Sequence, residues 1–306
     1  MKEIIGFIKA YYHEVNKLIL VFCTLFISVL VWLNYQHQLE YRLIYKAGLL
    51  IPGFTGHFLI YLAGFLIPYI LLLLIRKKRY PEPPGFWICL LTAPVIFAIK
   101  VSMDTYVDLS ADDHWNNYWN DIIYWPLRMI VLVAILSVCR LLFHKKETLY
   151  GLSAKKFNYA PYLIMLLIMV PLITAASTQP DFLVVYPKMK MVLPLPDDAG
   201  PTWFYKLLFE LSYGSDFFSI EIFFRGFLIV GFMKWMGKDA ILPMACFYCT
   251  IHFGKPLGEC ISSYFGGLLL GIVSYNTRSI YGGLMVHLGI AWLMELGGYI
   301  GNVLQH

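Results

Sequence analysis

Two side chains of opposite charge stand four positions apart in an otherwise apolar stretch, Ser219–Gly226. Glu221 and Arg225 share one face of a helix at this spacing and can form an ion pair. Ionisable groups surrounded by apolar residues are costly unless they are paired. The spacing therefore predicts either a reactive polar site or a structural ion pair that fixes the helix.

Two histidines follow in separate apolar stretches. His252 ends the segment Tyr248–His252, and His287 lies within Val286–Ala291. A neutral imidazole can bind zinc or transfer a proton, although many buried histidines are only hydrogen-bonded. We take both as candidate catalytic residues and candidate zinc ligands, on the condition that helix packing brings the two rings together.

The cysteines are weaker candidates for a metal site. Cys246, Cys249 and His252 recur every three residues, but a helix turns about 100° per residue, so this set spreads over about 300°. All six cysteines are scattered through apolar segments, which is typical of buried thiols rather than of a disulfide framework. The sequence favours a site without cysteine ligands.

Two further glutamates are auxiliary candidates. Glu259 follows His252 beyond the helix-breaking stretch Gly254–Gly258, so we expect it to begin the next helix, where the helix dipole stabilises a carboxylate. Glu295 lies two turns after His287. We keep both because a hydrolytic site needs a carboxylate within reach to accept a proton.

The composition shows what surrounds these residues. Hydrophobic residues make up 59% of the 306 positions and charged residues 14%, whereas soluble proteins average roughly 45–50% and about 25%. This composition excludes a soluble enzyme, a nucleic-acid-binding protein, a disordered chain and a fibre. We therefore expect membrane lipid, and no nucleic acid, as a partner.

A helix needs about 20 mostly apolar residues to cross a membrane. Such runs predict an all-α polytopic bundle of eight or nine transmembrane helices. The runs are Leu18–Tyr35, His57–Ile75, Phe86–Met103, Ile122–Phe143, Ala160–Ser177, Trp203–Trp235, Ala240–Phe253, Cys260–Asn276 and Ile280–Asn302. The first run lacks a small-residue cleavage site and is interpreted as a retained anchor. Prolines exclude a regular helix in Thr178–Pro201.

Basic residues fall in alternate loops. The run Arg76–Arg79 follows the second predicted helix and four lysines between 145 and 156 follow the fourth, whereas Asp104–Asp121 contains five aspartates and no basic residue. The positive-inside rule then places the N-terminus in the cytoplasm. We expect the membrane to be a bacterial cytoplasmic membrane. The acidic segment favours a solvated charge cluster over a divalent-cation site.

The chain divides near residue 158. Residues 1–158 supply accessory transmembrane helices, and residues 159–306 form a helical core that carries the candidate site. In this core, Gly267 and Gly271 form a small-xxx-small step that predicts close packing of helix backbones, and so do Gly297 and Gly301.

Taken in order, these motifs resemble the CAAX-processing and bacteriocin-processing (CPBP, or Abi) family of intramembrane metalloproteases. That family is recognised by a Glu-Glu-x-x-x-Arg helix, an aromatic-x-x-x-His helix and a His-x-x-x-Asn helix. Glu221 and Arg225 match the second Glu and the Arg of the first motif. Tyr248 and His252 match the second motif, and His287 matches the His of the third.

The resemblance implies an intramembrane metal-dependent endopeptidase of the CAAX prenyl-protease type. It implies Glu221, Arg225, His252 and His287 as catalytic residues, and zinc held by the two histidines. The implied substrate is a peptide or protein with a hydrophobic or lipidated segment. The resemblance covers about a third of the chain, near residues 203–300, and the oligomeric state stays open.

Two positions depart from the family pattern. Ile220 stands where the family has its first Glu, the residue assigned to activate the attacking water, and Ala291 stands where the family has Asn. An active enzyme would need a substitute carboxylate, for which Glu221 ranks first and Glu259 second. The resemblance thus implies the fold more strongly than the activity.

Two other functions stay open. Ile220 and Ala291 are compatible with a catalytically degenerate member that acts as an immunity or scaffold protein. Intramembrane Glu, Arg and His also mark the ion paths of transporters. The sequence shows no inverted repeat, and its ionisable intramembrane residues crowd into one third of the chain, so transport is the weaker alternative.

Overall fold

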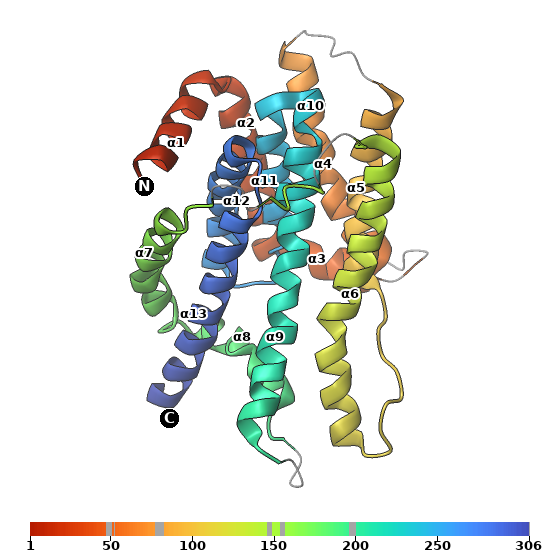
Figure 1. The fold of residues 1–306 in the computed structure, drawn as a ribbon, viewed down its shortest axis with the longest axis vertical. Coiled ribbons are helices and arrows are strands. Elements are labelled where there is room, and N and C mark those ends of the chain that lie inside the picture. Colours follow the sequence, from red (N-terminus) through yellow and green to blue (C-terminus); the bar gives the residue numbers. More distant parts are fainter. Residues whose placement is uncertain are drawn as a thin grey trace. The chain divides into compact units, whose positions relative to one another are not determined.

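A computed structural model describes residues 1–46, 51, 53–76, 83–145, 149–153, 157–195 and 200–305. The described residues form helices joined by turns and loops, with no strand among them (Figure 1). The predicted all-α fold is confirmed. Most of the basic residues used to predict orientation (Lys77–Arg79, Lys146, Lys155 and Lys156) lie outside the described residues, so the cytoplasmic N-terminus stays a prediction.

Six helices of the described chain are long and apolar enough to cross a membrane, and the protein is an integral membrane protein. They are α2 (Lys17–His37), α4 (Phe54–Arg76), α5 (Pro84–Ser102), α6 (Asp113–Phe143), α12 (Leu257–Thr277) and α13 (Tyr281–Gln305). Helix α7 (Ala160–Ala176) and the segment Pro180–Val192 pass the same test only together. They are bent by 99° and make a seventh span if counted as one.

Eight or nine spans were expected, whereas six helices of the described residues, or seven spans with the bent pair, pass this test of length and composition. The run predicted at Trp203–Trp235 contains α9 (Thr202–Glu221), whose charged residues Lys206, Glu210, Asp216 and Glu221 make it too polar. The run predicted at Ala240–Phe253 contains α11 (Ile241–Thr250), which at ten residues is about 15 Å long and too short for a bilayer core of about 30 Å.

The remaining elements are short. They are α1 (Lys2–Glu14), α3 (Leu39–Tyr41), the π-helices η1 (Arg42–Lys46) and η3 (Ile222–Gly231), α8 (Pro180–Val185), α10 (Met233–Met236), and the 3₁₀-helices η2 (Lys188–Val192) and η4 (Gly237–Ala240). Apart from the six-residue α8 and the five-residue η2, the described part of Thr178–Pro201 is not helical, as its prolines predict.

Helix α6 begins earlier than the apolar pattern indicates. Its first turn is capped by the Asp112 carboxylate, which accepts a hydrogen bond from the Trp115 backbone N–H at 2.9 Å. The side-chain oxygen of Asn116 then accepts one from the Leu109 backbone N–H at 2.7 Å. The segment predicted as an acidic loop is therefore helical from Asp113 onward, where Asp112 caps the first turn.

The helices group into two compact units. Unit 1 comprises Met1–Ser102, Ala134–Phe157 and Glu221–Gly283, and unit 2 comprises Met103–Val133, Asn158–Ile220 and Leu284–His306. Each unit draws on both halves of the sequence. The division near residue 158 describes where the motifs lie, not how the helices pack.

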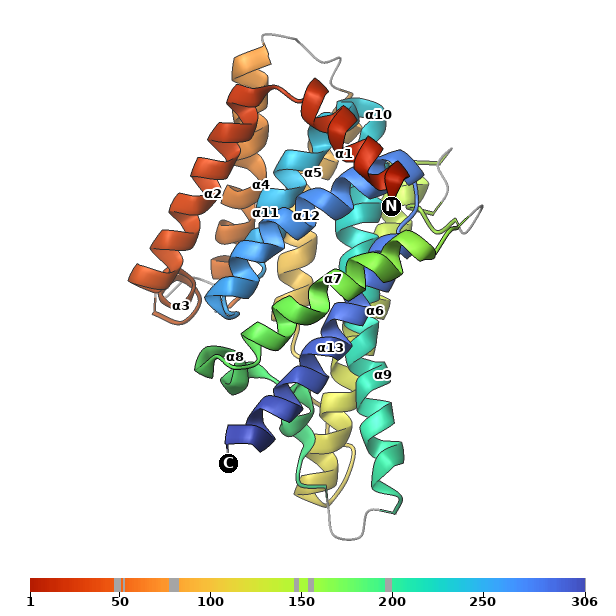
Figure 2. The same ribbon diagram turned by 90° about the vertical axis from the view of Figure 1, so that its left-hand side faces the viewer.

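Unit 1 is built around α4, α5, α11 and α12, with α2 and η3 packed against them (Figure 2). Helices α11 and α12 approach closely because two glycines of α12 face larger side chains of α11. A Cβ on Gly267 would lie 2.9 Å from Tyr248, and one on Gly271 would lie 2.6 Å from Met244. The predicted small-xxx-small packing is confirmed here.

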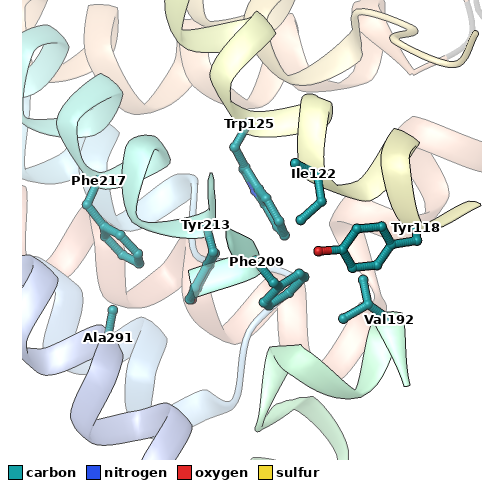
Figure 3. Close-up of a cluster of buried hydrophobic side chains, with 8 residues drawn as sticks. All are labelled: Tyr118, Ile122, Trp125, Val192, Phe209, Tyr213, Phe217 and Ala291. Carbon is teal, nitrogen blue, oxygen red and sulfur yellow. The ribbon is translucent and has the colours of Figure 1, made fainter. Parts of the chain in front are cut away.

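Unit 2 has its own apolar core, in which aromatic rings of α9 face α6. Trp125 of α6 lies 5.5 Å from Phe209 and 5.2 Å from Tyr213, measured between ring centroids (Figure 3). On α13, a Cβ on Gly301 would lie 2.4 Å from the Ser177 carbonyl oxygen. The second small-xxx-small step therefore also serves packing.

Candidate functional site

Glu221 and Arg225 form a fully buried ion pair in unit 1. Both side chains are 0% exposed, and Arg225 Nη1 lies 3.1 Å from Glu221 Oε1. This contact is an ion pair between neighbouring turns of the helix. The pairing predicted from the four-residue spacing is present in the fold.

The pair lies where the backbone changes its helical form. Helix α9 ends at Glu221, and η3 continues as a ten-residue π-helix that is buried along its whole length. π-Helical turns are rare in proteins, and those that occur are often found at functional sites. A close loop contact accompanies the π-helix, because a Cβ on Gly226 would lie 2.6 Å from the Tyr150 carbonyl oxygen.

Tyr248 of α11 holds the other face of the guanidinium. The Arg225 guanidinium carbon lies 4.2 Å from the centroid of the Tyr248 ring, which is a cation–π distance. The same ring lies 4.7 Å from that of His252, edge to face. Tyr248 thus links the Glu221–Arg225 ion pair to His252, just beyond the end of α11.

His252 lies just beyond the end of α11 and is 9% exposed. Its Nδ1 is 2.9 Å from the Tyr248 carbonyl oxygen. A carbonyl only accepts hydrogen bonds, so Nδ1 carries the proton and the lone pair lies on Nε2. The Tyr248 carbonyl of α11 thus holds the ring in one tautomer.

The Glu221 carboxylate is also enclosed by the first turn of α13. A Cβ on Gly283 would lie 2.2 Å from Glu221 Oε2, so this position accepts no side chain without displacing the carboxylate. Sequence reasoning did not identify Gly283. The only sequence signal was the pair Gly282-Gly283, one turn before His287.

Glu259 lies in the first turn of α12, as predicted, but it does not cap the helix through its side chain. Its Oε1 lies 3.8 Å from Lys255 Nζ, a partly exposed ion pair. Such pairs contribute little to stability. Glu259 and Lys255 therefore place opposite charges beside the turn that follows His252.

His287 belongs to unit 2. Its ring packs edge to face on Phe217 of α9, with the ring centroids 4.8 Å apart. Ala291, one turn further along α13, lies in the apolar cluster that contains Phe217 (Figure 3). The position where the related family has Asn is thus in hydrophobic surroundings.

Glu295 has a structural contact in unit 2. Its Oε1 accepts a hydrogen bond from the Lys188 backbone N–H at 2.6 Å, and Oε2 accepts one from that of Met189 at 3.1 Å. These N–H groups begin η2, so the carboxylate acts as its N-terminal cap. A role of Glu295 as a proton acceptor would compete with these two hydrogen bonds.

The cysteines associate in pairs rather than with His252. Cys249 Sγ lies 3.9 Å from Cys260 Sγ, while Cys246 Sγ points to the Cys23 carbonyl oxygen, also at 3.9 Å. Within the described ranges, no three His, Cys, Asp or Glu side chains converge as a metal site requires. Catalytic zinc sites have three protein ligands, so the described residues do not supply a complete set for zinc.

Comparison with known proteins agrees with the motif resemblance. Residues 207–293 match the family model described as type II CAAX prenyl endopeptidase Rce1-like. This segment is similar to that family over less than a third of the chain. The matched range contains Glu221, Arg225, His252 and His287, and it points to protease activity in general. No curated protein and no solved structure matches the chain.

Proposed function

We propose that this protein is an intramembrane endopeptidase that cleaves a peptide or protein with a hydrophobic or lipidated segment. The observation that supports this most directly is the buried set Glu221, Arg225, Tyr248 and His252. One titratable imidazole is held there in a defined tautomer beside a fixed ion pair. Membrane lipid is the expected surrounding partner.

His252 is the proposed general base. With its proton on Nδ1, the ring presents the Nε2 lone pair to a water molecule, and it gains a charge when it takes the water's proton. The hydroxide then attacks the scissile carbonyl carbon. The imidazolium returns the proton to the leaving amine, so the ring ends the cycle in its starting form.

Arg225 and Glu221 have complementary proposed roles. Arg225 supplies positive charge near the oxyanion that develops on the scissile carbonyl. Glu221 keeps this buried charge neutralised in the resting protein. Glu221 also ranks first as the carboxylate that assists His252, in place of the Glu that the family has at the position of Ile220.

His287 is proposed as the second imidazole of the reaction, on the strength of its motif position in the matched segment. His252 and His287 remain the two proposed zinc ligands, one fewer than the three protein ligands of a catalytic zinc site. Zinc analysis of the purified protein tests this directly, with a His252→Ala, His287→Ala double variant as reference.

A non-catalytic scaffold or immunity function is the second candidate, and one observation favours it. Ile220 and Ala291 are both buried, at 8% and 3% exposure, and Ala291 lies in an aromatic cluster. In this alternative the site holds a partner helix without cutting it. The test is cleavage itself.

The decisive experiment is cleavage of a library of hydrophobic and lipidated peptides by the protein in lipid nanodiscs. His252→Ala should abolish turnover. His57→Ala is a matched control, because His57 Nδ1 also lies 2.9 Å from the carbonyl oxygen of the residue four positions earlier, Gly53. Ile220→Glu should raise turnover if the missing carboxylate limits the rate. Equal cleavage by wild type and His252→Ala would exclude the proposed chemistry.

A further inference from the structure

The turn that follows His252 is held by residues more than 200 positions earlier in the sequence. Three consecutive residues of this turn, Phe253, Gly254 and Lys255, each contact one residue of the α2–α3 segment. All of these residues belong to unit 1. Figure 2 shows α3 at the end of α2, beside the beginning of α12.

Asn34 makes the central contact. It is 7% exposed, and its Nδ2 donates to the Phe253 carbonyl oxygen at 2.9 Å. Its Oδ1 accepts a hydrogen bond from the Glu40 backbone N–H at 3.0 Å. One buried amide therefore satisfies a carbonyl of the His252 turn and an N–H of α3 at the same time.

Two neighbouring residues contact the same turn. The Tyr35 hydroxyl donates to the Lys255 carbonyl oxygen. The Glu40 carboxylate lies against Gly254, with Oε2 3.1 Å from the position that a Cβ would take. Gly254 thus allows α3 to approach, and a side chain at this position would push the Glu40 carboxylate away.

These contacts matter because α11 ends before His252. The helix stops at Thr250, so carbonyls beyond it need partners outside the helix. The His252 backbone N–H donates to Cys249 O at 3.0 Å, and its carbonyl accepts from the Lys255 N–H at 3.0 Å. The peptide groups beside His252 are therefore fixed by this turn, and Asn34 fixes the next carbonyl.

We propose that Asn34 is a positioning residue for His252, acting through the Phe253 carbonyl. The N-terminal helices α2 and α3 are then part of the reactive site rather than an accessory bundle. Only the expected effect of Asn34 on catalysis rests on the proposed function. The position of the His252 ring is measurable without any substrate.

The first measurement is the ¹⁵N NMR signal of the His252 imidazole in labelled protein in nanodiscs. Asn34→Leu removes both hydrogen bonds, and Asn34→Asp at neutral pH keeps the acceptor for the Glu40 N–H but loses the donor to Phe253. Both variants should shift the His252 nitrogen signals and mix its tautomers. The His57 signals should stay unchanged in the same spectra.

Asn302→Leu is the matched control. Asn302 Nδ2 donates to the Tyr186 carbonyl oxygen at 3.0 Å, a bond of the same kind in unit 2. It should leave the His252 signals in place. A change as large as that of Asn34→Leu would overturn the proposal, because any buried Asn would then have the same effect.

The second measurement is turnover, since a displacement of about 1 Å can lower a rate on the order of 100-fold. In a protein that cleaves, Asn34→Asp should lower kcat by 10- to 100-fold while KM changes little. Unchanged His252 signals in both Asn34 variants would overturn the positioning role. Shifted signals in a protein that cleaves nothing would support that role and reject only the proposed function.

Discussion

The two units use the same kinds of polar side chain differently. In unit 1, the carboxylate of Glu221 faces a guanidinium, and the ring of His252 is fixed by the Tyr248 carbonyl of α11. In unit 2, the carboxylate of Glu295 binds two backbone N–H groups, and the ring of His287 packs on Phe217. The groups around each side chain, and not its residue type, therefore determine what that side chain does.

This difference has an energetic meaning. A carboxylate that caps a helix replaces water on backbone groups and adds stability to one local element. A buried ion pair exchanges solvation for mutual attraction, and it is seldom the most stable solution available. Unit 1 therefore retains a costly arrangement where unit 2 has an ordinary one, as expected when charge serves a reaction.

The largest predicted effect comes from breaking the ion pair of unit 1. Glu221→Gln leaves Arg225 buried without a compensating charge, which should lower the free energy of unfolding by about 3–5 kcal/mol. Glu295→Gln keeps one acceptor oxygen for the η2 backbone, so it should cost only about 1 kcal/mol. Thermal unfolding in nanodiscs compares the two.

The double variant Glu221→Leu, Arg225→Met separates charge from packing. It removes both buried charges, so stability should recover to within about 1–2 kcal/mol of the wild type while cleavage is lost. If Glu221→Gln is no more damaging than Glu295→Gln, the distinction between the units is wrong.

The local contacts and the helices could largely be predicted from the sequence, but the long-range geometry could not. The spacing of Glu221 and Arg225 predicts their contact because i, i+4 pairing is local. The run Leu18–Tyr35 likewise predicts α2 to within two residues at each end, because an apolar run of this length forms a helix in lipid.

Long-range contacts were not predictable in this way. The bond from Asn34 to Phe253 joins residues 219 positions apart, and nothing in either segment indicates its partner. The π-helix η3 has an apolar sequence that is equally compatible with an α-helix, so tertiary packing selects it. The expected number of spans exceeds the six or seven candidates among the described residues because the charged residues of α9 were averaged with the apolar residues that follow.

A smaller predicted effect tests the close approach of glycines in each unit. Gly283→Ala places a methyl group 2.2 Å from Glu221 Oε2, and Gly301→Ala places one 2.4 Å from the Ser177 carbonyl oxygen. Overpacking of this kind costs about 1–3 kcal/mol, so both variants should unfold earlier than wild type.

Only the glycine of unit 1 should also alter cleavage, since it displaces the Glu221 carboxylate. Gly258→Ala is the control, because a Cβ there has no heavy atom within 4 Å. Peptide cleavage per folded molecule is the measurement. Equal loss of activity in Gly283→Ala and Gly301→Ala would mean that overpacking acts through general stability.

The next effect is a pH dependence that belongs to unit 1. Burial raises the pKa of Glu40 from 4.5 to about 7. A raised pKa means that Glu40 binds its proton more tightly in the folded protein than in the unfolded one. The contribution of the protonated carboxyl to stability is therefore complete below pH 4.5. It is lost as the pH rises to about 7.

The unfolding midpoint of the wild type should therefore fall over this interval, and Glu40→Gln should remove that part of the decrease. The Glu40 carboxylate lies against Gly254, and the next residue, Lys255, pairs with Glu259. Lys255→Met therefore serves as the reference for their influence. An identical pH profile in wild type and Glu40→Gln would show that burial of this carboxyl is not the cause.

The smallest effect is expected for the exposed pair Glu14–Lys238, which joins α1 to η4 within unit 1. The hydrogen bond and charge of Lys238 hold the pKa of Glu14 below 4.5. This contribution is present above pH 4.5 and is lost as the pH falls through the lowered value, the opposite sign to Glu40. Glu14→Gln should change the unfolding midpoint only slightly, and 1 M salt should remove even that difference. A large, salt-resistant loss would mean that the position of α1 depends on this pair, and that exposed charges in unit 1 matter as much as its buried ones.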